Sequence, residues 1–63
     1  MYPRLEELMK SKEWDTGHLA DCIKSTWWKA YHRRKGDTEF SPLEMETIAK
    51  VMGVSVEELF KEG

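Results

Sequence analysis

The sequence has a single cysteine and neither asparagine nor glutamine among its 63 residues. One cysteine, Cys22, cannot form the internal disulfide framework that stabilises many small secreted domains. No apolar run approaches the roughly 20 residues that a membrane-spanning helix needs, and the opening MYPRLEELMK lacks the apolar core of a signal peptide. We therefore expect a cytoplasmic protein with no membrane partner.

Strand patterns are also missing, because no alternating apolar run is flanked by the turn residues of a hairpin. The sequence contains no repeat and no low-complexity segment. A chain of this length forms one domain and buries only about 60% of its unfolded surface, so its core is thin. We therefore expect residues 1–63 to form a single all-α domain of five short helices.

Cap residues, prolines and glycines divide the chain into these helices. Asp15 and Thr26 are good N-cap residues, and Ser41 and Ser55 each precede a glutamate by three residues, the spacing of a capping box. Gly36 is placed to end a helix with a positive φ. The predicted helices cover about residues 2–12, 16–23, 27–35, 42–52 and 56–60.

Basic residues are concentrated in the third of these helices and just before it. The stretch from Lys24 to Lys35 contains five lysines and arginines and no acid, so it carries a charge of about +5, although the whole chain has a net charge of −2. Two tryptophans, a tyrosine and a histidine lie in the same stretch. A basic face with aromatic residues is typical of a protein that binds nucleic acid. The alternative interpretation of this stretch is a solvated charged helix with no partner.

Several short motifs carry a resemblance to a known family. They are Asp15, the pair Leu19-Ala20, Ile23, Gly36, the segment GDTEF over residues 36–40 and the segment GVSVEELF over residues 53–60. In this order they resemble the lambda-repressor-like (Cro/XRE) helix-turn-helix family, in a phage or prophage type. The resemblance implies that the third helix is a recognition helix, which enters the major groove of double-stranded DNA.

The departures from the family pattern lie in and near the third helix. Lys24 stands where the family usually has glycine, and Ser25 where it usually has an aliphatic residue. The inward positions, where the family prefers larger aliphatics, hold Ala30, Arg33 and Arg34. We expect an aromatic ring to fill that space, or the arginine stems to lie along the core edge with their charged ends in water. Our hypothesis is that the recognition helix was altered for its target, by evolution or by design.

The resemblance and the helical spacing together predict two sets of DNA contacts. The expected base contacts are Trp27, Trp28, Tyr31 and His32, whose rings can touch thymine methyl groups or offer one polar atom. The expected phosphate contacts are Thr16, Thr26, Lys29, Arg33, Arg34, Lys35 and Thr38. Because large aromatic residues are mostly buried, we expect one of the two tryptophans to lie in the core instead.

Other chemistries find little support in the sequence. His18 and Cys22 share a helix face, but a closed zinc site would also need Asp21, which points elsewhere, so we expect neither metal nor cofactor. No nucleophile elbow or phosphate loop is present, and we expect no enzyme. The predicted function is sequence-specific DNA binding by a nucleoid-associated repressor or regulator, or by a designed binder. The alternative is a protein-interaction module; a monomer or a weak homodimer fits either.

Overall fold

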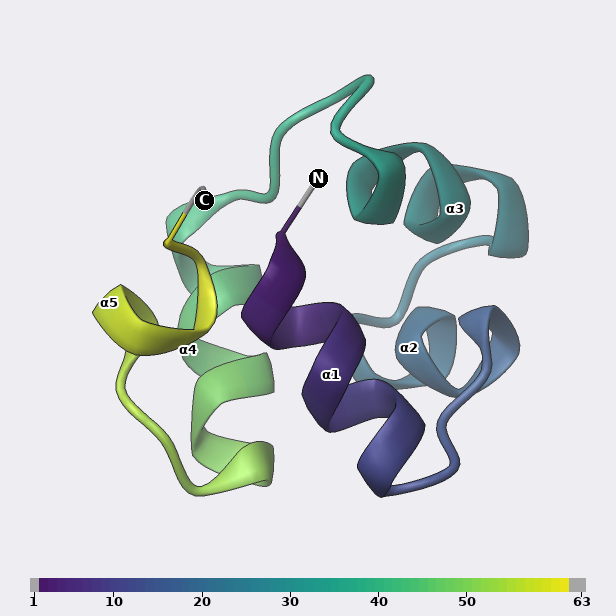
Figure 1. Ribbon diagram of the computed structural model, residues 1–63. Helices are drawn as coiled ribbons and strands as arrows, with labels where there is room; N and C mark the ends of the chain where they lie inside the picture. Colours follow the sequence, from purple (N-terminus) through teal and green to yellow (C-terminus); the bar gives the residue numbers. More distant parts are fainter. Residues whose placement is uncertain (1, 62–63) are drawn as a thin grey trace.

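Five helices follow one another in the computed structural model, which describes residues 2–61 (Figure 1). They are α1 (Pro3–Ser11), α2 (Thr16–Cys22), α3 (Trp27–Lys35), α4 (Pro42–Met52) and α5 (Val56–Leu59). No strand occurs in this part of the chain, so the expected all-α class is confirmed. Residues 1, 62 and 63, which the single-domain prediction included, lie outside the described part.

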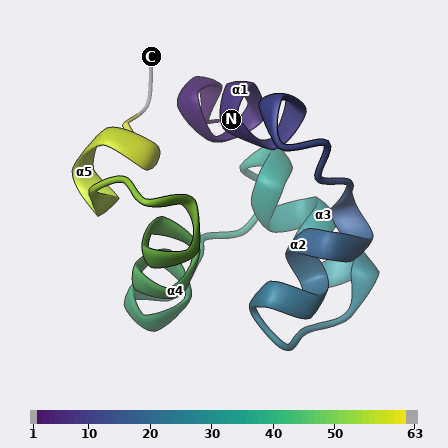
Figure 2. The ribbon, with the colours of Figure 1, turned by 90° about the horizontal axis from the view of Figure 1, so that it is seen from below.

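The helices form two groups on either side of α1. α2 and α3 pack together on one side, and α4 and α5 lie on the other (Figures 1 and 2). α5 contacts both α4 and α1, and so connects the second group of helices to α1. This arrangement leaves the outer side of α3 without a helix packed against it.

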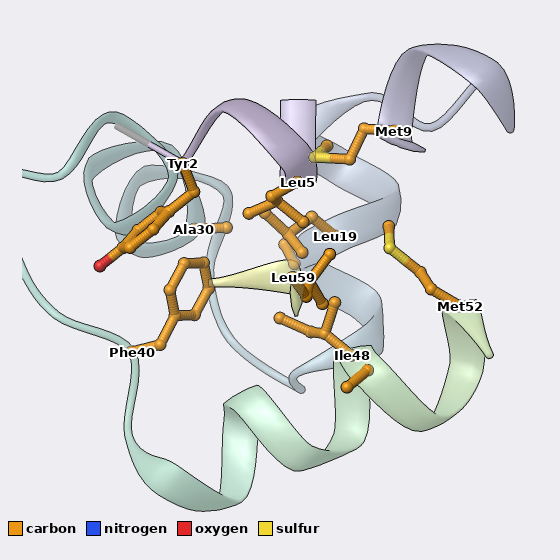
Figure 3. Close-up of a cluster of buried hydrophobic side chains, with 11 residues drawn as sticks. Tyr2, Leu5, Met9, Leu19, Ala30, Phe40, Ile48, Met52 and Leu59 are labelled. Carbon is orange, nitrogen blue, oxygen red and sulfur yellow. The ribbon is translucent and has the colours of Figure 1, made fainter. Parts of the chain in front are cut away.

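Apolar side chains from all five helices meet in one core (Figure 3). Leu5, Leu19, Ile48 and Leu59 are fully buried at its centre. Tyr2 and Phe40 lie with their ring centroids 5.8 Å apart near one edge. Among the described residues, α3 contributes only Ala30 to this core, so most of its surface is available for other roles.

Side-chain caps form at the helix N-termini where the sequence predicts them. The Oδ1 atom of Asp15 accepts from the backbone N–H of His18 at 2.8 Å, and Oγ1 of Thr26 accepts from that of Lys29 at 3.2 Å. Ser41 and Glu44 form both bonds of a capping box. These side chains satisfy donors that a helix N-terminus otherwise leaves unpaired.

The turn between α2 and α3 contains a backbone conformation that is unusual for lysine. Lys24 has a φ of 53°, in the left-handed region, at the position where the resembled family usually has glycine. Each such residue costs roughly 1–2 kcal/mol because its Cβ crowds a carbonyl oxygen. The turn is nevertheless closed by a 2.9 Å hydrogen bond from the N–H of Ser25 to the carbonyl of Ala20. The α2–α3 geometry is therefore kept at the expense of strain.

The helices are short in relation to a lipid bilayer. The longest one described, α4, has 11 residues. Within residues 2–61, none combines the length and the apolar character that crossing a membrane requires.

Candidate functional site

Both tryptophans of α3 lie on the protein surface. Trp27 is 46% exposed and Trp28 is 65% exposed, whereas Ala30 is fully buried. The prediction that one of the two indoles lies in the core is therefore wrong. The small side chain of Ala30 lets α3 approach the core closely, and this packing turns both indoles outward.

Three exposed rings and the half-buried ring of Tyr31 form one continuous cluster on α3. We call this cluster the aromatic face: Trp27, Trp28, Tyr31 and His32. Trp27 stacks on Tyr31, with ring centroids 5.0 Å apart and an interplanar angle of 12°. Trp28 stands edge-on to both of these rings, at 84° and 90°, and lies 6.2 Å from His32. The Nζ atom of Lys35 lies 5.2 Å from the Tyr31 centroid, within the range of a cation–π contact. Mutual packing thus holds the rings in place on the surface.

Arg34 lies at the edge of the aromatic face, where it lines a groove with Tyr31 and Lys35, and it is bound within the protein. Its Nε and Nη2 atoms donate to the two carboxylate oxygens of Glu6 at 2.6 and 2.7 Å. Its Nη1 atom donates to Oγ1 of Thr16 at 2.9 Å, and Thr16 itself is buried. The hydrogen bond to Glu6 is the main cause that raises the pKa of Arg34 above its ordinary value. These three side chains join α1, α2 and α3.

Arg33 is also engaged within the protein. Its Nη1 atom donates to Oγ of Ser25 at 3.2 Å, and its Nε atom lies 3.5 Å from a carboxylate oxygen of Glu44. That Nε–H is buried and makes no hydrogen bond among the described residues. Because Glu44 also belongs to the capping box of α4, Arg33 connects α3 to the start of α4.

The two arginines therefore follow the second of the two sequence expectations, in which their stems line the core edge. Their side chains are only 22% and 27% exposed, and their charged ends find protein partners rather than water alone. Sequence reasoning missed Glu6 and Glu44 as those partners. Glu6 and Arg34 are 28 residues apart, and no local spacing signals such a pair.

The other predicted phosphate contacts remain at the surface. Lys29, Lys35 and Thr38 are exposed around the aromatic face and its C-terminal end. Thr26 is exposed and uses its oxygen lone pair for the cap, so its hydroxyl hydrogen is still able to donate. The first turn of α3 contains no acid. Positive charge is thus available on the rim of the rings.

His32 has an acidic neighbour at the end of α3. Its Nδ1 atom lies 3.0 Å from a carboxylate oxygen of Asp37. This hydrogen bond is the main cause that lowers the pKa of Asp37, with Lys35 adding a smaller attraction. The pair fixes one edge of the His32 ring, whose side chain is 47% exposed.

Two open grooves adjoin α2, and Cys22 lines both of them. One, of about 280 Å³, is lined by Cys22, Ile23, Lys24, Leu43, Glu44 and Thr47. Burial raises the pKa of the Cys22 thiol, which disfavours the nucleophilic thiolate. His18 stacks on Trp14 with centroids 4.4 Å apart. Within residues 2–61, no three His, Cys, Asp or Glu side chains gather as metal ligands would.

The surface features of α3 are the strongest functional signal in the described structure. Exposed indoles are costly to leave in water, and here they are grouped, mutually packed and surrounded by cations. Comparisons of the chain with protein-family models, with curated proteins and with solved structures find no match.

Proposed function

We propose that this protein binds double-stranded DNA in a sequence-specific way, with α2 and α3 acting as a helix-turn-helix and α3 entering the major groove. The observation that carries the proposal is the division of α3 into two sides. One side is fixed by Ala30 and two engaged arginines, and the other carries the aromatic face. A helix held in this way can be inserted into a groove without losing its packing on the core.

The charge distribution supports a polyanionic partner. Lys29 and Lys35 flank the rings, and Lys24 is exposed in the preceding turn. Each can approach a backbone phosphate as a point charge while the rings reach the bases. We assign phosphate contacts to Lys29, Lys35, Thr26 and Thr38. Arg33, Arg34 and Thr16 are left out of this set, because each side chain is already hydrogen-bonded to another side chain of the protein.

In this proposal the protein acts as a transcriptional regulator, because a small domain that covers one half-site can block or recruit other proteins there. Its net charge of −2 disfavours coating DNA at random and favours docking of the one basic face. The resemblance to lambda-repressor-like proteins points to the same activity.

The test is a selection from randomised duplexes at near-physiological salt, followed by titration of the selected duplex. We expect the affinity to fall steeply between 50 and 200 mM salt, with a slope set by the number of phosphate contacts. Lys29→Ala and Lys35→Ala should each flatten that slope by about one and weaken binding to all duplexes. Lys50→Ala is the matched control, since Lys50 is exposed on α4 and lies outside the proposed helix-turn-helix. If the selection enriches no sequence, the proposal is contradicted.

A protein-interaction module is the second candidate, and the exposure of both tryptophans favours it. Tryptophan is enriched at the hot spots of protein interfaces, where its ring fills a pocket of the partner. An interface built on the aromatic face would respond weakly to salt, because apolar burial does not depend on counterion release. The salt titration therefore separates the two candidates.

A further inference from the structure

We propose that the aromatic face selects duplexes whose major groove presents the C5-methyl groups of pyrimidines, in thymine or in 5-methylcytosine. This inference rests on the proposed function and narrows it to a class of target. It follows from which side chains of α3 are free, and from what those side chains can recognise.

The usual reader of guanine is missing from the free surface of α3. Arginine or lysine can contact guanine O6 and N7, but only the planar fork of an arginine matches both acceptors with two fixed donors. Arg34 already uses its fork on the carboxylate of Glu6, and Arg33 is divided between Ser25 and Glu44. Both side chains are only partly exposed, and the guanidinium of Arg34, which lies beside Tyr31, is bound to Glu6. Freeing either one would break contacts that fasten α3 to its neighbours.

The usual reader of adenine is missing as well. Bidentate recognition of adenine N6 and N7 needs the amide of asparagine or glutamine, and the sequence contains neither residue. The acidic reader of cytosine N4 is also absent from the first turn of α3. Hydrogen-bonding readout is thus reduced to single polar atoms on the rings and to the Lys29 ammonium.

The aromatic face is instead suited to methyl groups. Trp28 stands at 84° to Trp27 and at 90° to Tyr31, so the face of one ring meets the edge of the next. Such a corner offers apolar surface on two sides of a small group that protrudes into it. In the major groove the only apolar group on a base edge is the C5-methyl of thymine, or of methylated cytosine. Trp27 and Trp28 occupy the first turn of α3, the part that reaches base edges in a groove-bound recognition helix.

The test compares versions of one selected duplex that differ only in methyl groups. Replacing thymine by uracil removes the methyl and leaves the Watson–Crick pairing and the phosphates unchanged. We expect the affinity to fall about fourfold for each contacted methyl, and about 15-fold for two, from the free energy of burying one such group. The salt slope should stay the same, because no phosphate contact is lost.

The second arm distinguishes the two sources of the methyl group. Each contacted T·A pair is replaced by C·G, with and without methylation of the cytosine. Tighter binding to the methylated version means that either source is read. Equal binding of the two, together with weaker binding to uracil, means that thymine alone is read. Equal affinity for thymine and uracil duplexes, together with equal affinity for both cytosine duplexes, overturns the inference.

Two variants tie the discrimination to the aromatic face. Trp28→Ala should bring the thymine-to-uracil affinity ratio close to one, and its 65% exposure means that the core does not depend on it. Leu43→Ala removes another exposed apolar side chain, 72% exposed on α4, and should leave the ratio unchanged. If the wild-type protein binds no duplex, or binds duplexes with an affinity that does not depend on salt, the proposed function fails. If it binds duplexes with salt dependence, and both the thymine-to-uracil and the methylated-to-unmethylated cytosine affinity ratios are one, only this inference fails.

Discussion

α3 and α4 have similar lengths and similar side-chain caps, but they are held to the protein by different forces. α4 buries Ile48, Ala49 and Met52 in the core, whereas α3 buries Ala30 alone. α3 is instead fastened by the ion pairs and hydrogen bonds of Arg33 and Arg34. A helix attached by polar side chains along its inner edges is free to present large rings outward. The difference separates a helix that contributes apolar burial to the core from a helix that leaves its largest side chains on the surface, where the proposed function places the partner.

The largest difference between α3 and α4 should appear when a large apolar side chain is removed from each helix. Ile48→Ala should lower the free energy of unfolding by about 3 kcal/mol, because it leaves a cavity in the fully buried core. Trp28→Ala removes a larger side chain, but it should change the free energy of unfolding by about 0.5 kcal/mol or less, since that ring is mostly in water. Urea unfolding followed by circular dichroism measures both. Similar losses for the two variants would show that the aromatic face also supports the fold.

Removing the charged attachment of α3 should have the next largest effect. Arg34→Ala leaves the Glu6 carboxylate and the buried Thr16 hydroxyl without their donor, and should lower the free energy of unfolding by about 2 kcal/mol. Arg34→Lys should recover only part of this loss, because an ammonium cannot form the two parallel bonds of the guanidinium. Urea unfolding at pH 7 provides the measurement. Unchanged stability combined with weaker DNA binding would instead assign Arg34 to a phosphate.

The smallest expected effect concerns the turn that sets α3 against α2. Lys24→Gly should raise the free energy of unfolding by about 1 kcal/mol, because glycine adopts the φ of 53° without the Cβ clash. Lys24→Ala is the control, since it removes the same charge and keeps the Cβ atom. Thermal unfolding should show a higher midpoint for the glycine variant than for the alanine variant. Equal midpoints would mean that the turn stores little strain.

The helices could be predicted closely because their boundaries depend on neighbouring residues. The predicted bounds of α3 agree with the structure, since Thr26 caps its first turn and Gly36 ends it with a φ of 95°. α5 is shorter than predicted and ends at Leu59, where a helix of four residues has little to hold its last turn. Element type and position were therefore local properties of this chain.

The composition of the candidate site was less predictable. The sequence identified the residues of the aromatic face, but it misplaced one tryptophan in the core. It also grouped Arg33 and Arg34 with the free lysines, although their acidic partners come from α4 and α1. Helical spacing shows which side chains share a face. It does not show which face the neighbouring helices will cover.

The sequence by itself determined five helices, their caps and a basic, aromatic third helix, because capping and periodicity act over three or four residues. Only the tertiary structure decided which side of α3 faces the core and which of its cations remain free. Those outcomes depend on contacts between residues far apart in the chain, such as Arg34 with Glu6, and on the close approach that Ala30 permits.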